Sequence, residues 1–311
     1  MLIKILQSLI FGLPQGLLYG LMGLGLSIIY GTTGAMNFAQ GNLGMFGVFA
    51  GWTVLVITKS LPFALIAGVF VGALAGYSMN RLLMKRVHTH ASMLIITLGV
   101  LLVLDGLVLI VWGTEPLLFP DIFSAPPILF TLPEIVNKNA IPLIIPGNDM
   151  LTGSTALLSA LILILFFKLS KLGKAVQARA QDELGARAVG VSVKKIDSIA
   201  WSIGIAVSVL CGFLMAPKTT VTATMLINLQ LYGFTAAVFG GFSSLTGALV
   251  GGILLGLIEK LVVLGFDELF TVFELSVNAV DFQLSIILVV IIITLAIKPT
   301  GLISAKFKGK V

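Results

Sequence analysis

Long apolar runs, separated by short polar connections, make up most of this sequence. A helix of about 17 to 25 apolar residues crosses a hydrocarbon core of about 30 Å. Only 10% of the residues are charged, against about 25% in soluble domains, so the chain could not cover a water-facing surface. We therefore predict an all-α integral membrane protein, a polytopic helical bundle of about eight or nine membrane segments. The candidate segments are Ser8–Tyr30, Met36–Ile57, Leu61–Asn80, Met93–Gly113, Thr152–Leu169, Asp197–Ala216, Leu229–Phe239, Leu245–Leu264 and Phe282–Ile297.

Lysine and arginine are concentrated in some connections, and acidic residues in others. The basic regions are 81–90, 168–195 and the carboxyl end, and the acidic regions are 114–151 and 265–281. Short basic loops remain on the cytoplasmic side of a membrane. This pattern predicts an external loop at 114–151, a cytoplasmic loop at 170–196 and a cytoplasmic carboxyl terminus.

The side of the amino terminus depends on Leu229–Phe239, which is too short to cross a membrane as a helix by itself. If this segment crosses as part of a broken or re-entrant element, counting back from the carboxyl end puts the amino terminus outside. If it does not cross, the number of crossings falls by one and the amino terminus lies on the cytoplasmic side. The sequence leaves the two alternatives open.

Several classes of function are not expected. The net charge of +6 is explained by basic loops that face anionic membrane lipid and a partner protein, and no basic stripe with interleaved aromatic residues indicates nucleic-acid binding. The only cysteine is Cys211, and the sequence has no histidine or carboxylate cluster at metal-ligand spacing and no phosphate-binding loop. We therefore expect no enzymatic activity, no metal and no cofactor.

Two glycine-rich segments carry polar residues inside the apolar sequence. They are Gly31–Gly51 and Gly233–Gly256, and each reads as a short apolar piece, a glycine-marked break and a new helix. Broken helices persist in a membrane only where protein or a water-filled cavity lines them. Corresponding breaks in two halves of a chain indicate inverted repeats beside a translocation path. The candidate pathway residues in these segments are Asn37, Gln40, Asn42, Thr235, Ser243 and Ser244.

Close packing of helices through small residues is the alternative explanation of such glycines. It suits the evenly spaced Gly12, Gly16 and Gly20 well. For Gly31–Gly51 both explanations stay open, because packing alone does not require three carboxamide side chains.

Asp105 is an acid deep inside an apolar run. An aspartate at the membrane centre costs about 2.5 to 3.5 kcal/mol on insertion scales, so its side chain should face the bundle interior or water. We add it to the candidate pathway residues. A hydrogen-bonded acid that caps neighbouring backbone is the simpler role, and a proton relay is the alternative.

The connection at residues 173–196 reads GKAVQARAQDELGARAVGVSVKKI. It favours helix until Gly190, which suits a helix stop, and its alanines leave a narrow face that another protein could contact closely. A surface helix lying on anionic lipid is the alternative, but the mixed charges favour docking to a partner. The candidate docking residues are Arg179, Asp182, Glu183, Arg187 and Gly190.

The loop resembles the coupling segment of ABC importer permeases, which docks on the ATPase. Within that group, four motifs resemble the branched-chain amino acid permease family: NFAQG at 37–41, GKAVQARAQDELGARAVGV at 173–191, FTAAVFGGFSSLTGALVGG at 234–252 and KPTGL at 298–302. They lie in the family's order and extend over nearly the whole chain. The family more often has histidine at the position of Gln40 and proline at that of Thr246.

This resemblance implies that residues 1–311 form one permease domain, a multi-pass protein of the inner (plasma) membrane. The implied function is import of branched-chain amino acids or similar small polar solutes. The implied partners are two cytoplasmic ABC ATPase subunits, a second related permease and an extracytoplasmic substrate-binding protein. A urea or short-amide permease shares the pattern and remains an alternative, as does an ion-coupled secondary transporter, which would leave the coupling-type loop without a purpose.

Overall fold

The computed structural model describes residues 1–87, 89–131, 142–274 and 277–297. In this part of the chain, seven helices are long and apolar enough to cross a membrane. This confirms the predicted helical membrane bundle, because helices satisfy every backbone hydrogen bond internally, as hydrocarbon requires. The seven are α1 (Leu2–Thr33), α2 (Gln40–Thr58), α3 (Leu61–Leu82), α4 (His90–Trp112), α5 (Gly147–Leu169), α8 (Val193–Thr219) and α10 (Leu245–Val272).

The remaining elements are shorter. Two of them, α9 (Ile227–Gly240) and α11 (Gln283–Ile297), correspond to the other two predicted membrane segments. They are not among the seven long helices, so a total of eight or nine membrane segments stays a prediction. Two small strands pair in antiparallel fashion with Leu129 opposite Ile144. The short elements are α6 (Lys171–Gln181), α7 (Glu183–Ala188), α9 (Ile227–Gly240), α11 (Gln283–Ile297), β1 (Ile128–Phe130), β2 (Leu143–Ile145) and 3-10 turns at Met84–Arg86 and Ala279–Phe282.

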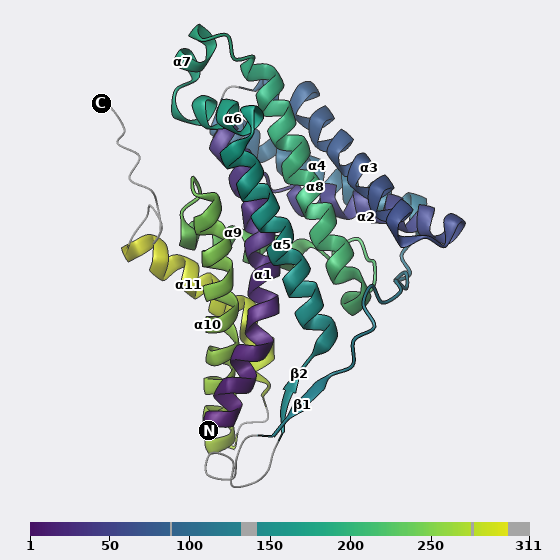
Figure 1. Ribbon diagram of the computed structural model, residues 1–311, viewed down its shortest axis with the longest axis vertical. Coiled ribbons are helices and arrows are strands. Elements are labelled where there is room, and N and C mark those ends of the chain that lie inside the picture. The colour runs from purple at the N-terminus through teal and green to yellow at the C-terminus, as the bar shows by residue number, and fades with distance from the viewer. Residues whose placement is uncertain (88, 132–141, 275–276, 298–311) are drawn as a thin grey trace.

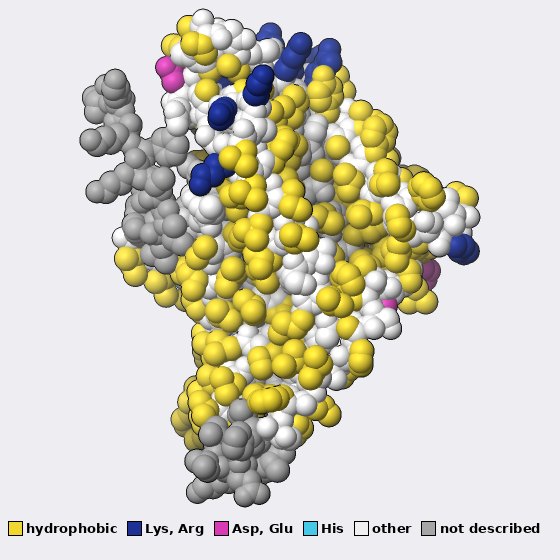
Figure 2. Space-filling model, viewed as in Figure 1, with side chains coloured by type: hydrophobic (Ala, Val, Ile, Leu, Met, Phe, Trp, Pro, Cys, Tyr) yellow, Lys and Arg dark blue, Asp and Glu magenta, His cyan; other side chains and the backbone are white. Residues whose placement is uncertain are grey.

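The bundle has two chemically different ends. α1 runs along its length, α6 and α7 lie at one end, and the amino terminus and the β1–β2 hairpin lie at the other (Figure 1). Figure 2 shows lysine and arginine side chains gathered around the α6–α7 end, with mostly hydrophobic side chains over the flank below. The amino-terminal end of α1 is held at the hairpin end, where Gln7 Nε2 donates a hydrogen bond to the Ile144 carbonyl at 2.7 Å.

Small residues allow α1 and α10 to pack closely, as expected for Gly12, Gly16 and Gly20. A Cβ atom placed at Gly16 would lie 2.7 Å from the carbonyl oxygen of Gly252. The backbones of the two helices therefore touch, and van der Waals contact replaces the hydrophobic driving force that lipid does not provide between helices.

Two non-helical turns lie in the middle of the bundle, and each interrupts a pair of consecutive helices. After α1 ends, residues 34–39 turn back, and α2 begins at Gln40, whose amide lies against Gly25 in the inner part of α1. After α8 ends, residues 220–226 turn back in the same way before α9 begins. α1 and α8 run in opposite directions (Figure 1), so the two interruptions follow helices of opposite direction. The inverted repeats stay a prediction.

The position of the second interruption differs from the prediction. The glycine-marked break in Gly233–Gly256 is the tight turn between α9 and α10, where Gly241 has φ 94° and Phe242 packs on Tyr30 near the end of α1. The interruption that matches residues 34–39 comes before α9, in a stretch without glycine. Its residues meet the segment that follows α4 instead, where Leu117 and Val221 form an isolated β-bridge.

Candidate translocation site and coupling surface

Gln230 joins α2 and α9, the two helices that begin inside the bundle. Its Oε1 accepts a hydrogen bond from the Gly41 backbone N–H at 2.5 Å, and its Nε2 donates to the Phe38 carbonyl at 2.7 Å. The first turn of α9 is thereby tied to the first turn of α2. Gly41 leaves room for this contact, because a Cβ at position 41 would lie 2.5 Å from Gln230 Oε1 and would displace the amide.

Gln230 was not among the predicted site residues. With Asn228 it is one of two carboxamides in an otherwise apolar stretch at the start of Leu229–Phe239. Carboxamides in an apolar stretch were a signal of the same kind that drew attention to Asn37. The partner segment could not be read from the sequence, because it lies 189 positions away.

The three predicted carboxamides of the first interruption lie together in the bundle core. Asn37, Gln40 and Asn42 are each no more than 2% exposed. Asn37 Oδ1 accepts a hydrogen bond from the Ala39 backbone N–H at 3.0 Å, but Asn37 Nδ2, both amide atoms of Gln40 and Asn42 Oδ1 have no protein partner within the described residues. A buried polar atom without a partner costs about 1 to 3 kcal/mol, so this site is suited to a polar ligand.

Asp105 joins the same site from α4. Asn42 Nδ2 donates a hydrogen bond to Asp105 Oδ1 at 2.6 Å. The acid therefore contacts a side chain on another helix and does not cap neighbouring backbone, which corrects the simpler role expected for it. It also borders a cavity of about 280 Å³ lined by Phe49, Asp105, Leu109, Gly113, Thr114, Glu115, Thr222, Ala223 and Thr224.

A second cavity, of about 290 Å³, lies toward the other end of the bundle. Its lining residues are Tyr30, Gly34, Ala35, Met36 and Leu94, which come from the end of α1, the start of the interruption and α4. The segment from Asn37 to Asn42 lies between the two cavities. Met36, just before it, borders the second cavity, and Asn42 is hydrogen-bonded to Asp105, which borders the first.

The predicted residues of the second glycine-rich segment are placed elsewhere, and none lines these two cavities. Thr235 is buried and its hydroxyl donates to the Leu231 carbonyl within α9. Ser244 is the N-cap of α10 and accepts a hydrogen bond from the Gly247 backbone N–H at 3.0 Å. Ser243 is exposed in the α9–α10 turn. Hydroxyls can satisfy nearby backbone groups, which accounts for the contacts of Thr235 and Ser244.

The loop at 170–196 contains two helices where the sequence indicated one. Asp182 has extended backbone and ends α6, and its side chain accepts a hydrogen bond from the Leu184 backbone N–H as the N-cap of α7. Aspartate is a preferred N-cap residue, so the break has a local cause. The predicted stop at Gly190 agrees with the structure: its φ is 83°, and Val191 N–H bonds to the Ala186 carbonyl as in a Schellman motif.

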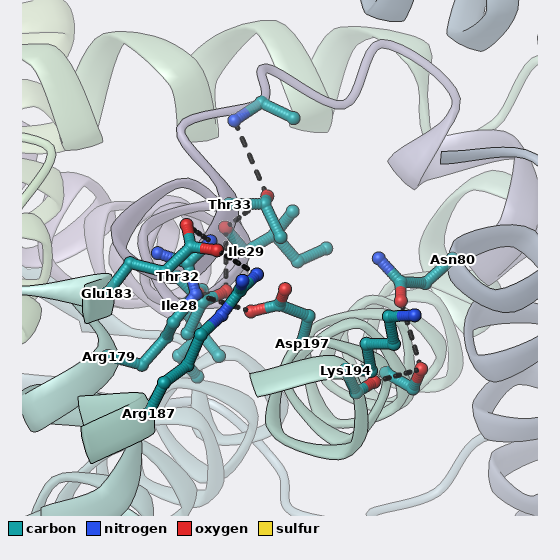
Figure 3. A network of polar contacts seen from close by, with 12 residues as sticks. Ile28, Ile29, Thr32, Thr33, Asn80, Arg179, Glu183, Arg187, Lys194 and Asp197 are labelled. Carbon is teal, nitrogen blue, oxygen red and sulfur yellow. Dashed lines mark hydrogen bonds and ion pairs between the residues drawn. The ribbon is translucent and has the colours of Figure 1, made fainter. Parts of the chain in front are cut away.

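The charged residues of this loop differ in their surroundings. Figure 3 shows them beside Thr32 and Thr33 at the end of α1. Arg179 is only 15% exposed and forms ion pairs with Glu183 at 3.1 Å and with Asp197 of α8 at 3.2 Å. Arg187 is 55% exposed and pairs with Glu183 on the outer side. Arg179 therefore fastens α6 to α8, whereas Arg187 lies on the exposed side of the loop.

α7 also presents apolar side chains to the outside. Leu184 and Val189 are 76% and 79% exposed, at the end of the bundle where basic side chains gather (Figure 2). Leucine and valine exposed beside Arg187 form a surface of the kind that protein interfaces use.

Comparison with known proteins agrees with this architecture. A family described as "Branched-chain amino acid transport system / permease component" matches residues 8–295. The permease protein LivH of the high-affinity branched-chain amino acid transport system of Escherichia coli (strain K12) is 26% identical, covering 82% of this chain and 85% of LivH. The corresponding protein BraD of Pseudomonas aeruginosa is 27% identical over 82% and 85% of the two chains, and a probable LivH of Methanocaldococcus jannaschii is 28% identical over 93% and 89%.

A solved structure shares the fold. A chain of PsaBC from Streptococcus pneumoniae, in complex with Fab, superposes with a TM-score of 0.50 at 18% identity over 93% of this chain and 91% of that chain. The seven long apolar helices, the two interruptions and the family match over nearly the whole length lead to one assignment. The chain belongs to the family of permease components of branched-chain amino acid transport systems.

Proposed function

We propose that this chain is the membrane-spanning subunit through which an ATP-driven importer moves branched-chain amino acids across the inner membrane. The observation that carries this proposal is the meeting of α2 and α9 at Gln230, inside the bundle. Helix amino termini inside a membrane are the usual means of binding a polar solute at mid-depth. The named relatives transport branched-chain amino acids, which favours these solutes over urea or a short amide.

The path runs from the cavity beside Asp105, past Asn42, Gln40 and Asn37, to the cavity beside Tyr30. In this state the buried carboxamides block the way between the two cavities. Movement of α9 relative to α2 would break the Gln230 contacts and open one side at a time. Such a movement shifts a population between two states, and its energy must come from a binding partner.

The loop at 170–196 is the element that transmits this energy from the ATPase to the bundle. Leu184, Val189 and Arg187 form the docking surface for a cytoplasmic ATPase, and the Arg179–Asp197 ion pair passes its movement to α8. α8 leads directly into the interruption before α9, so a displacement at the loop reaches the pathway through one helix. A second permease subunit and an external binding protein complete the importer, with 114–151 on the external side and the carboxyl terminus in the cytoplasm. The residues from 298 onward lie outside the described part of the chain.

ATP dependence separates this proposal from an ion-coupled transporter. Vesicles that contain the chain with its ATPase and binding protein should accumulate leucine only when ATP is present on the ATPase side. Collapse of the proton and sodium gradients should leave the initial rate unchanged. Uptake without ATP, driven by either gradient, would favour a secondary transporter.

The pathway itself is tested by replacing carboxamides. Asn37→Leu combined with Gln40→Leu removes polar atoms without partners and should lower leucine uptake at least tenfold, while the protein remains inserted at wild-type amounts. Thr235→Val is the matched control, because that hydroxyl is equally buried but is used within its own helix. Normal transport by the double variant would return this segment to a packing role.

A further inference from the structure

Asp105 is a carboxylate without a cationic partner inside the described bundle. The ion pairs found among the described residues do not include it. Its hydrogen bond comes from the neutral amide of Asn42, through Nδ2 to Oδ1 at 2.6 Å. An intramembrane acid normally pairs with an opposite charge or faces a water-filled path. Asp105 therefore offers a negative charge that the protein itself leaves uncompensated.

The cavity beside Asp105 is lined by both polar and apolar side chains. Glu115 adds a second carboxylate, and Phe49 and Leu109 are apolar. A cavity that carries negative charge concentrates cations and excludes anions. This chemistry suits a molecule that carries both a positive group and a hydrocarbon group.

Asn42 orients the carboxylate of Asp105 at the cavity. It is 2% exposed and its Nδ2 donates to Asp105 Oδ1. The cavity lining adds the hydroxyl groups of Thr114, Thr222 and Thr224, whose oxygens can accept hydrogen bonds. An ammonium group carries three donors and no acceptor, so a carboxylate and hydroxyl oxygens satisfy it together. A neutral amide or urea would leave the charge of Asp105 uncompensated.

We propose that Asp105 binds the α-ammonium group of the amino-acid cargo, with the cargo's apolar side chain against Phe49 and Leu109. This inference rests on the proposed function and adds the residue that distinguishes an amino acid from a neutral amide within the membrane. A charge-assisted hydrogen bond is about twice as strong as a neutral one. Selection at Asp105 therefore acts on charge, in addition to any selection by a binding protein.

The test measures binding to the purified permease in its assembled transporter by saturation-transfer NMR. The two probes are 3-methylbutylamine, which has a branched apolar chain and an ammonium group, and 3-methylbutanamide, its neutral counterpart. The amine should bind and be displaced by leucine, and the amide should bind at least tenfold more weakly. Asp105→Asn should weaken amine binding at least tenfold, whereas Asp105→Glu should retain binding within a few fold. Asp121→Asn changes an exposed acid that lines a different cavity and should have no effect.

Equal signals from the two probes, a signal from neither, or amine binding that survives Asp105→Asn would each overturn this assignment. None of these results bears on whether the wild-type complex takes up leucine with ATP. Failure of that uptake would instead reject the proposed function. Displacement of the amine by sodium at equal concentration, with no displacement by leucine, would identify an inorganic cation site and also reject the ammonium assignment.

Discussion

Gln230 of α9 and Gly41 of α2 are joined by a hydrogen bond of 2.5 Å between residues 189 positions apart. The same side chain donates to the Phe38 carbonyl at 2.7 Å. One carboxamide thus fixes the starts of two helices that begin inside the bundle, so it sets the position of the candidate pathway residues between them.

Replacing Gln230 should disrupt transport more than folding. Gln230→Leu leaves the Gly41 N–H and the Phe38 carbonyl buried without partners, at about 1 to 3 kcal/mol each, and should reduce leucine uptake at least tenfold. Gly41→Ala should act similarly, because its Cβ would lie 2.5 Å from Gln230 Oε1. Gly31→Ala is the control, since no atom lies within 4 Å of the added Cβ. Uptake is compared at equal amounts of inserted protein, and wild-type rates for Gln230→Leu would contradict this role.

Changes at the α7 end should uncouple ATP hydrolysis from transport. Gly190→Val forces a β-branched residue into φ 83°, which such residues resist, and Leu184→Asp places a charge on the exposed apolar surface. Both should reduce co-purification of the ATPase at least tenfold and leave the permease inserted. Gly265→Ala, where nothing lies within 4 Å of the new Cβ, should behave as wild type. Full ATPase retention by both variants would make the loop a lipid-bound surface helix.

Arg179 and Arg187 should respond differently to charge reversal. Arg187→Glu alters the exposed side and should weaken ATPase docking while the permease unfolds at its usual temperature. Arg179→Glu puts an acid against Asp197 and Glu183, so it should lower the thermal stability of the permease itself. The measurement is thermal unfolding without the ATPase, followed by pull-down with it. Equal unfolding temperatures for the two variants would contradict the internal role of Arg179.

The α1–α10 contact should tolerate no larger side chain. Gly16→Val would bring its Cβ to 2.7 Å from the Gly252 carbonyl oxygen, and overpacking of this kind costs about 1 to 3 kcal/mol. The expected result is a lower unfolding temperature, reported by a thiol-reactive dye that reaches the buried Cys211 only on unfolding. Gly265→Ala serves again as the control. An unchanged transition for Gly16→Val would mean that the two helices separate more easily than their contact indicates.

Labelling tests the orientation of the bundle. A cysteine at Lys194, which is exposed near α7, should react with an impermeant reagent only from the cytoplasm, and one at Asp121 only from outside. Native Cys211 is buried and should give little background. Asp121 is chosen because it is exposed and lies in the predicted external loop at 114–151. Reaction of both cysteines in intact cells would overturn the topology.

The sequence by itself determined the class of fold. Apolar runs of membrane length required helices, because hydrocarbon offers no partner for unpaired backbone. The grouping of basic residues anticipated the basic end of the bundle, and the unusual carboxamides marked the first interruption. Helix ends were less accurate: α10 continues to Val272, past the acids Asp267 and Glu268, since a helix can extend beyond the apolar core into the polar interface.

Only the tertiary structure decided which side chains meet. Lipid and the bundle interior are both apolar, so the pattern of apolar residues along a membrane helix does not reveal its inner face. The contacts of Gln230 with Gly41 and of Asn42 with Asp105 join residues far apart in the chain, and no local period records them. The second interruption escaped prediction for the same reason: residues 220–226 turn back because of what packs around them, without a glycine to mark the place.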